Sequence, residues 1–255
     1  MVPSESELTA NFVGAIKAFA ESAGGKVKET SGVICIKTPL KPAFFNATFL
    51  NAQTTLSKNL LEKIKAFYRD RKAEWCFTVS PGAEPLLETI IEHAKVTGRH
   101  TTAEMVVSKE NVRFREQPPD LEVEVVSNLK NLGTWLRVSE KGWGLEPGSF
   151  RPLVTKQSLE FPGATYFLGL NNGKPVSTSM SFISDKIVGI YNVSTIPEAR
   201  GKGFGEALTA AAIKHGFENG CTISSLQASP KGFPVYFRMG FRRVYDYEIW
   251  IIKNT

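Results

Sequence analysis

A run of glycines and basic residues in the C-terminal half has the residue types that most clearly suggest chemistry. Residues 191–208 read YNVSTIPEARGKGFGEAL, so β-branched residues precede the glycines and strong helix formers follow them. This pattern predicts a strand, a tight turn and then a helix. Glycines let backbone N–H groups converge, and the first turn of a helix adds unpaired donors and partial positive charge. The segment therefore predicts an anion site suited to a pyrophosphate.

Two common phosphate-binding motifs do not fit this segment. The sequence lacks the G-x-x-x-x-G-K-[ST] pattern of a P-loop. The dinucleotide pattern G-x-G-x-x-G fails because Glu206 stands where its third glycine belongs. What remains is Arg200-x-x-Gly203-x-Gly205.

Residues downstream of the glycines extend the pattern. Residues 226–229 read LQAS and residues 236–241 read YFRMGF, and three predicted β segments precede the turn. The region 121–252 resembles the GNAT (Gcn5-related N-acetyltransferase) superfamily, which has an R/Q-x-x-G-x-G/A turn and a later Tyr-x-x-x-Gly-Phe. The resemblance implies an acyltransferase that uses acetyl-CoA.

The resemblance also implies which residues bind the cofactor. The turn would hold the pyrophosphate, and the end of the preceding strand would hold the pantetheine arm. The implied cofactor-binding residues are Val193, Ser194, Thr195, Ile196, Arg200, Gly201, Lys202, Gly203, Phe204, Gly205, Glu206, Ser229, Phe233 and Tyr236. Ser229 stands where the family often has an Asn, and its shorter side chain puts that contact in question.

The resemblance assigns two catalytic functions. A backbone N–H near Val193 or Ser194 would polarise the thioester carbonyl, and Tyr236 would protonate the departing thiolate. The acceptor would be a primary amine of a small molecule or peptide, acetylated by direct transfer. The alternatives are that Tyr236 is a core aromatic, and that Arg200 and Lys202 are solvated surface charges.

The sequence does not identify a general base. The predicted strand 187–193 contains no acidic residue, whereas many family members have one there. Tyr191 or Asn192 could position a water, and Glu160 and Glu198 are interpreted as surface charges. The missing base leaves a second hypothesis open, a catalytically weak CoA-binding regulatory or scaffold module.

Hydrophobic periodicity and turn residues predict the elements that hold these residues. In the first half we expect helices at 8–23, 57–70 and 86–97, the last closed by Gly98, and strands at 33–36, 44–50, 75–79 and 101–107. In the second half we expect strands at 121–126, 166–170, 176–183, 187–196, 223–228 and 241–252, and helices at 128–140, 203–219 and 233–239.

The two halves share a pattern. An aromatic-Asn pair occurs at 45–46 and at 191–192, and Ser-Pro-x-x-x-Pro occurs at 80–85 and at 229–234. The turn at 51–56 lacks the glycine motif, and Leu87 stands where the second half has Tyr236. The Gln-Pro-Pro-Asp sequence that ends at Asp120 is typical of a linker.

We therefore predict an α/β (α+β) protein of two tandem GNAT-like units, each a mixed, mostly antiparallel sheet flanked by helices. Residues 1–116 would form a degenerate unit and residues 117–255 the catalytic domain.

Composition excludes several classes of protein. The 255 residues carry a formal net charge of +6, spread over both halves, which argues against a nucleic-acid surface. No apolar run is long enough for a membrane span, and the acidic start does not resemble a secretory signal. Three distant cysteines suggest a reducing compartment, the cytoplasm, and no His or Cys spacing suggests a metal site. A monomer or a homodimer would fit, and Trp143, between two glycines, is a candidate for the acceptor pocket.

Overall fold

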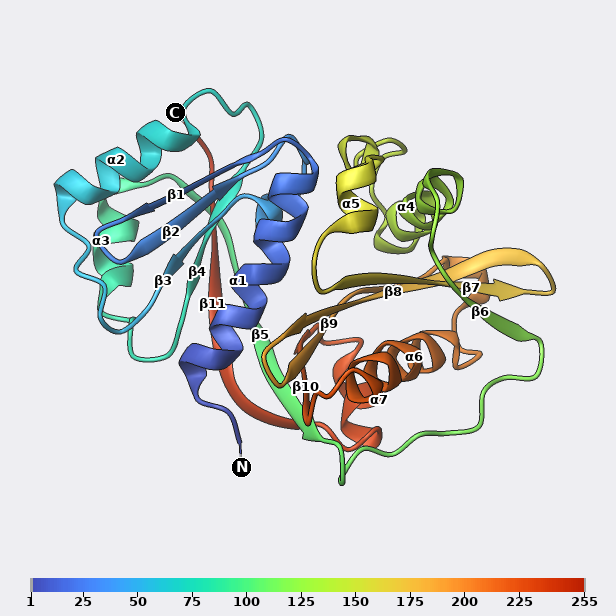
Figure 1. The fold of residues 1–255 in the computed structure, drawn as a ribbon. Helices are drawn as coiled ribbons and strands as arrows, with labels where there is room; N and C mark the ends of the chain where they lie inside the picture. The colour runs from blue at the N-terminus through green and yellow to red at the C-terminus, as the bar shows by residue number, and fades with distance from the viewer. Residues whose placement is uncertain (1, 255) are drawn as a thin grey trace.

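The computed structural model describes residues 2–254 and contains a single mixed sheet of 11 strands flanked by helices (Figure 1). The strand order is β1-β2-β3-β4-β11-β5-β10-β9-β8-β7-β6. None of the helices within residues 2–254 is long and apolar enough to span a bilayer.

The N-terminal half contains helices and strands that join the same sheet as the C-terminal half. They are α1 (Glu5–Ser22), β1 (Lys26–Thr30), β2 (Val33–Lys37), the 3-10 turn η1 (Ala43–Phe45), β3 (Ala47–Leu50), α2 (Lys58–Tyr68), β4 (Trp75–Val79), α3 (Leu86–His93) and β5 (Val96–Ser108).

The elements of the C-terminal half follow a connection without regular structure. They are β6 (Leu121–Val125), α4 (Leu129–Trp143), η2 (Arg151–Leu153), α5 (Lys156–Glu160), β7 (Ala164–Asn171), β8 (Lys174–Ser184), β9 (Ile187–Thr195), η3 (Pro197–Ala199), α6 (Phe204–Glu218), β10 (Ile223–Ala228), α7 (Phe233–Arg238) and β11 (Arg242–Ile252).

Helix ends follow local capping. The Ser4 hydroxyl accepts from the Glu7 N–H while the Glu7 carboxylate accepts from the Ser4 N–H, which is a capping box at the start of α1. The Asn128 side chain caps α4, which ends at Gly144 in the left-handed region. These signals place α1 and α4, the two helices that lie over one face of the central sheet.

The sheet confirms the predicted fold class and shows how the two halves are joined. Each half has one parallel pair, β3 with β4 and β9 with β10, among otherwise antiparallel neighbours. β11 lies between β4 and β5, and β5 lies between β11 and β10. Each half therefore contributes its last strand to the sheet of the other (Figure 1). The predicted boundary at 116/117 falls in the connection between β5 and β6, but the sheet continues across it.

Some predicted elements differ from the structure. The helix expected at 86–97 ends at His93, and β5 already begins at Val96, so the prediction that Gly98 closes the helix is wrong. Gly98 instead lies beside β11, where an added Cβ would be 3.5 Å from Ile251 Cδ1. The segment expected as a strand at 44–50 begins as a 3-10 turn, and neither β1 nor α5 was expected.

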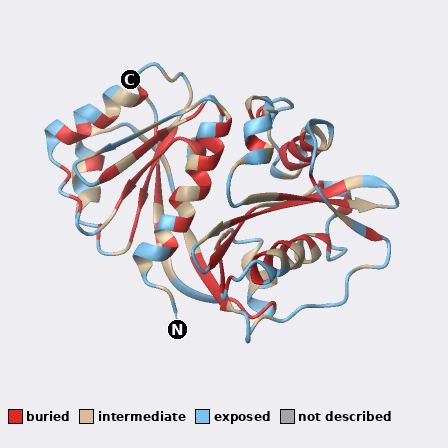
Figure 2. Cartoon of the chain, in the orientation of Figure 1, coloured by how far each residue is buried: buried red, intermediate tan, exposed pale blue. Residues whose placement is uncertain are grey.

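The core fills both faces of the sheet and runs through the junction of the halves (Figure 2). α2 and α3 cover one face of the N-terminal strands, and α1 covers the other. α4 and α5 lie on the same face as α1, while α6 and α7 lie on the opposite face (Figure 1). Phe45 and Phe150, one from each half, meet edge to face with ring centroids 5.5 Å apart. One hydrophobic cluster therefore spans both halves, while a separate cluster lies under α2 and α3.

Candidate functional site

The glycine-rich turn has the backbone geometry that its sequence predicts. Gly201 and Gly203 have φ values of 78° and 80°, a left-handed conformation that disfavours other residues, and α6 begins directly after Gly203. An added Cβ at Gly205 would lie 3.4 Å from Thr195 Oγ1, so the first turn of α6 lies close to the end of β9. The unpaired N–H groups of α6 therefore open beside β9.

β9 separates from β10 just before this turn. The two strands pair only over three positions, from Ile187 opposite Ile223 to Gly189 opposite Ser225. Beyond Gly189, β9 continues to Thr195 along β8 alone, whereas β10 continues along β5 to Ala228. We call this gap in the pairing of β9 and β10, which lies beside the N-terminus of α6, the slot.

The matching strands of the N-terminal half do not separate. β3 and β4 pair from Ala47 opposite Cys76 to Leu50 opposite Val79, which is the whole length of β3. The Ser80 N–H adds a bond of 2.9 Å to the Leu50 carbonyl beyond the last pair. The slot is therefore a feature of the C-terminal half, within the residues 2–254 that are described.

A β-bulge shapes the edge of β9 that lines the slot. The register shifts so that Asn192 and Val193 both fall between the pairs Met180–Tyr191 and Thr178–Ser194. Asn192 has a φ of 50°, which an Asn tolerates better than most residues. The bulge includes Val193, and Ser194 follows it directly; these are the two residues near which the N–H that polarises the carbonyl was predicted.

Asn192 is held in this conformation by α4. Its Oδ1 accepts hydrogen bonds from Ser139 Oγ at 2.6 Å and from Trp143 Nε1 at 2.9 Å. Its Nδ2 is buried and has no hydrogen-bond partner among the described residues. The matching Asn46 has both ends of its amide bonded, to Thr38 N, Leu40 O and Pro42 O. The amide is therefore structural in the first half and leaves a free donor in the second.

The end of α4 is locked against β9 from two sides. An added Cβ at Gly142 would lie 1.9 Å from Ser194 Oγ. Arg200 donates from Nη2 to the Gly142 carbonyl at 2.7 Å and from Nε to the Thr195 carbonyl at 3.1 Å. Arg200 thus ties α4 to the glycine turn, with the rest of its guanidinium exposed at the site.

The other charged residues of the turn differ in their surroundings. Lys202 is exposed and has no ion-pair partner among residues 2–254. Glu206 is engaged, because its carboxylate oxygens lie 3.5 Å from Arg115 Nε and 3.6 Å from Arg238 Nη2. A hollow of about 290 Å³ beside α6 is lined by Arg115, Lys202, Gly203 and Glu206, among others. The lining carries two cations, Arg115 and Lys202, and two anions, Glu116 and Glu206, so Lys202 is the cation of this hollow that has no ion-pair partner among the described residues.

The predicted residues Ser229, Phe233 and Tyr236 lie just after β10 and in α7. Tyr236 is half-buried between α7 and α6, and burial raises its pKa to about 12 against a smaller effect of the Thr209 hydroxyl. An added Cβ at Gly232 would lie 2.8 Å from Tyr236 Cε2. Ser229 is exposed, and its hydroxyl accepts from the Gly232 N–H at 3.1 Å, which fixes the turn before α7. Phe233 stacks on Phe237 with ring centroids 6.3 Å apart.

One buried carboxylate with notable chemistry, Glu104, was not predicted as a site residue from the sequence. Glu104 of β5 is fully buried, and its neighbour across the sheet is Gln227 of β10, at the diverging end of that strand. Glu104 Oε2 accepts from Gln227 Nε2 at 2.6 Å. The sequence signal was one carboxylate in the apolar stretch 103–107, but only the sheet shows what lies beside it.

The surface charges predicted as unrelated to catalysis are exposed. Glu198 forms an ion pair with Lys141, and Glu160 lies exposed at the end of α5. The described residues hold no group of three or more His, Cys, Asp or Glu side chains that could bind a metal.

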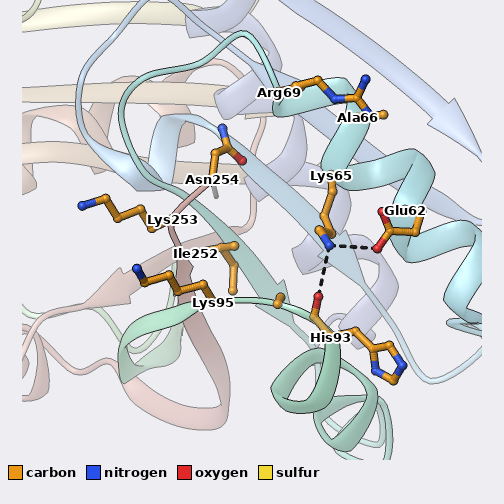
Figure 3. A pocket seen from close by; sticks show the side chains of 10 residues that line it. Glu62, Lys65, Ala66, Arg69, His93, Lys95, Ile252, Lys253 and Asn254 are labelled. Carbon is orange, nitrogen blue, oxygen red and sulfur yellow. Dashed lines mark hydrogen bonds and ion pairs between the residues drawn. The ribbon is translucent and has the colours of Figure 1, made fainter.

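A hollow of about 270 Å³ on the N-terminal half lies away from the slot, between α2, α3 and the end of β11 (Figure 3). Lys65 is bonded there to Glu62 and to the His93 carbonyl, while Lys95 and Lys253 point away from Lys65. Because its cations do not converge on a point, this hollow lacks the form of an anion site.

Comparison with known proteins finds a family match within the C-terminal half. Residues 133–241 match the model of the acetyltransferase (GNAT) family. No curated protein matched the chain in sequence.

Solved structures share the fold over nearly the whole chain. A GCN5-related N-acetyltransferase from Kribbella flavida has a TM-score of 0.69 at 16% identity and covers 96% of each chain. A functionally unknown conserved protein from Staphylococcus epidermidis has a TM-score of 0.62 at 19% identity, over 91% of this chain and 95% of that one. A tandem GNAT protein from the clavulanic acid biosynthesis pathway has a TM-score of 0.60 at 10% identity, over 100% of this chain and 97% of that one. The slot and the glycine turn lie within residues 133–241, the region that matches the acetyltransferase (GNAT) family, and the whole chain shares its fold with solved GNAT structures.

Proposed function

We propose that the C-terminal half binds acetyl-CoA and transfers its acetyl group directly to a primary amine of a small molecule or peptide. The observation that carries this proposal is the divergence of β9 from β10 next to the N-terminus of α6, which the N-terminal half lacks. A gap in strand pairing would let a thioester reach one face of the sheet while its phosphates stay on the other.

The residues around the slot fit such a ligand. The first N–H groups of α6 and the exposed Lys202 would bind the pyrophosphate, with Gly201 and Gly203 leaving room for it. The free backbone edge of β9 from Val193 to Ile196 would hold the amide groups of the pantetheine arm.

The chain also supplies groups for the transfer itself. An N–H at the bulge of β9, near Val193 or Ser194, would stabilise negative charge on the carbonyl oxygen. Tyr236 keeps its proton at neutral pH, because burial raises its pKa to about 12, and can give it to the departing thiolate. Asn192 Nδ2, a buried donor without a partner among the described residues, lies on the bulge next to Val193.

The proposal also places the enzyme in the cytoplasm. Cys35, Cys76 and Cys221 are free thiols and all are buried. Free thiols persist in a reducing compartment.

A thiol-release assay tests the proposal. Acetyl-CoA is incubated with the protein and with polyamines, aromatic amines, aminoglycosides or peptides, and free CoA thiol is measured against protein-free controls. We expect amine-dependent thiol release, with a KM for acetyl-CoA that rises about tenfold in Lys202→Ala and stays unchanged in Lys186→Ala, an exposed lysine at the opposite end of β9. Binding of acetyl-CoA without thiol release for any amine would favour a regulatory CoA-binding module.

A further inference from the structure

A buried polar cluster under α1 stands apart from the residues that the family resemblance assigns. Its centre is Glu104, which is 0% exposed and has Gln227 and Tyr245 as its neighbours on the two flanking strands. Side chains that face each other across neighbouring strands share one face of the sheet, so these three lie together. The cluster joins β5, which comes from the N-terminal half, to the strands of the slot.

Glu104 has an unused oxygen. Oε2 accepts from Gln227 Nε2 at 2.6 Å, whereas Oε1 has no hydrogen-bond partner within residues 2–254. No Lys, Arg or His of the described residues forms an ion pair with it. Burial raises its pKa to about 8, and the Gln227 bond opposes that rise. A buried carboxyl without a charged partner destabilises the fold relative to a neutral residue. Its presence despite this cost indicates a functional role.

The groups that face Glu104 are hydroxyls. Tyr191 of β9 and Tyr245 and Tyr247 of β11 lie close enough for the charge of Glu104 to raise their pKa values further. From α1, Thr9 bonds to Tyr247 Oη at 2.7 Å, and Asn11 Oδ1 accepts from Tyr191 Oη at 2.7 Å. Protonated tyrosines and amides can orient water or an ammonium group but cannot neutralise Glu104.

The cluster lies next to the slot. Gln227 is on the part of β10 that has left β9, and Tyr191 is on the facing part of β9, past their last pair. α1 and α4 cover this face, whereas the glycine turn and α7 serve the opposite face. A thioester carbonyl in the slot would therefore face α1, α4 and Glu104.

We propose that Glu104, supplied by the strand of the N-terminal half, accepts the proton that the acceptor ammonium must lose, through water that enters with the substrate. This inference rests on the proposed function and adds a substrate class, amines that are cationic at neutral pH. β9 carries no acidic residue, so the exchanged strand provides the carboxylate that β9 lacks.

The step balances. The Glu104 carboxylate takes one proton from R–NH3+, and the nitrogen lone pair forms the new C–N bond as the C–S bond breaks. Tyr236 protonates the leaving thiolate and regains a proton from the acylated nitrogen through water. Glu104 then releases its proton to solvent, so an ammonium and a thioester give an amide, a thiol and one proton.

Two probe amines test this inference. Benzylamine is protonated at neutral pH and needs a base, whereas hydroxylamine is already neutral at nitrogen. For Glu104→Gln at pH 7 we expect kcat/KM to fall about 100-fold with benzylamine and to stay within about threefold with hydroxylamine. The benzylamine rate should recover above pH 9, and Glu122→Gln, an exposed carboxylate on β6, should match the wild type.

A second variant protects the test from a folding defect. Acetyl-CoA should raise the melting temperature of Glu104→Gln as it does for the wild type. The hydrogen bond from Gln227 to Oε2 lowers the pKa of Glu104. Gln227→Met removes this bond and should therefore raise that pKa. We therefore expect the acid limb of its benzylamine profile to move to higher pH.

The outcomes separate the two proposals. If the wild type acetylates neither probe, the proposed function is wrong, and so is the assignment of Glu104 as proton acceptor. Acetylation of both probes, with Glu104→Gln equally active or equally impaired on the two, overturns the assignment of Glu104 alone. So does a wild type that acetylates only hydroxylamine.

Discussion

Tyr236 shows how one side chain depends on glycines elsewhere in the site. Its ring lies over Gly232, where an added Cβ would be 2.8 Å from Cε2, and tilts against Phe241 with ring centroids 5.9 Å apart. The family resemblance predicted its function, and the structure places it beside α6 at the slot. Its role as proton donor remains a prediction.

Tyr236→Phe should lower kcat for acetyl transfer about 100-fold, because the ring remains but the proton donor is lost. Acetyl-CoA affinity, measured by calorimetry, should change less than about threefold. Tyr166→Phe removes a hydroxyl from the buried face of β7 and serves as the control with unchanged kcat. Equal kcat values for Tyr236→Phe and wild type would show that the thiolate needs no proton from this residue.

Glu104 predicts an unusual dependence of stability on pH. Its pKa is raised from 4.5 to about 8, so the folded protein keeps a proton that the unfolded chain loses over this range. The free energy of unfolding should fall as the pH rises from 4.5 to 8 and then level off. Glu104→Gln cannot ionise, so its stability relative to the wild type should grow over the same range, to a few kcal/mol at most, on the order of 1.4 kcal/mol per pKa unit before relaxation.

Denaturant unfolding at pH 5, 6, 7 and 8 would measure this effect, with Glu122→Gln as the control. A constant difference between Glu104→Gln and wild type across these pH values would show that Glu104 is not held neutral by the fold.

The roles of some residues could be predicted from local sequence, whereas the roles of others depend on distant contacts. Gly201, Gly203 and Tyr236 belong to local motifs, whose spacing alone predicted a strand-turn-helix and a short helix. Glu104 acquires its chemistry from Gln227, more than a hundred positions away, and such pairings are invisible without the sheet. Asn192 was considered only as a water ligand, and its free Nδ2 depends on how α4 bonds the other end of its amide.

At the scale of elements, α4 positions the bulge of β9. Gly142 leaves no room for a Cβ against Ser194, and Trp143 bonds the bulged Asn192. The sequence predicted the helix and its glycine-rich end, but the contact with β9 depends on a packing distance that no local pattern contains.

Gly142→Ala should therefore lower the free energy of unfolding by about 1–3 kcal/mol, because α4 must move away from β9. Gly133→Ala lies on the same helix, where an added Cβ would meet only Arg137 Nη1 at 3.5 Å. That control should be neutral or stabilising by up to about 1 kcal/mol through helix propensity. Urea denaturation of both variants compares them, and similar values would contradict the close packing of α4 on β9.

The strands that were not predicted have weak hydrophobic patterns. β1 is a sheet-edge strand, KVKET, with mostly exposed residues, so it lacks the alternation that marks a half-buried strand. β5 is a long strand whose first residues, VTGRH at 96–100, are mostly polar, and they were assigned to the end of a helix or left unassigned. The first residues of β5 form a strand because β11 pairs with them.

At the scale of the whole molecule, the duplication predicted from 45–46, 80–85 and their counterparts matches the repeated order of strands. The exchange of β5 and β11 between the halves was not predicted, because both strands look like ordinary last strands in sequence. Exchange makes the N-terminal half a structural part of the C-terminal half, since β10 and β11 both pair with β5.

A fragment of residues 117–255 should accordingly fail to fold alone, because β10 loses its neighbour β5 and β11 loses both of its neighbours. Circular dichroism and limited proteolysis would show an unordered chain, and addition of residues 1–116 should restore structure and acetyl-CoA binding. A stable, acetyl-CoA-binding 117–255 fragment would show that the exchanged strands are dispensable.

Calorimetric titration with acetyl-CoA tests the central claim most directly, because it counts sites in a chain with two related halves. The slot and the glycine turn occur in one half, so we predict one acetyl-CoA bound per chain, with affinity weakened about tenfold by Lys202→Ala. No measurable binding, or two equivalent sites per chain, would contradict the account.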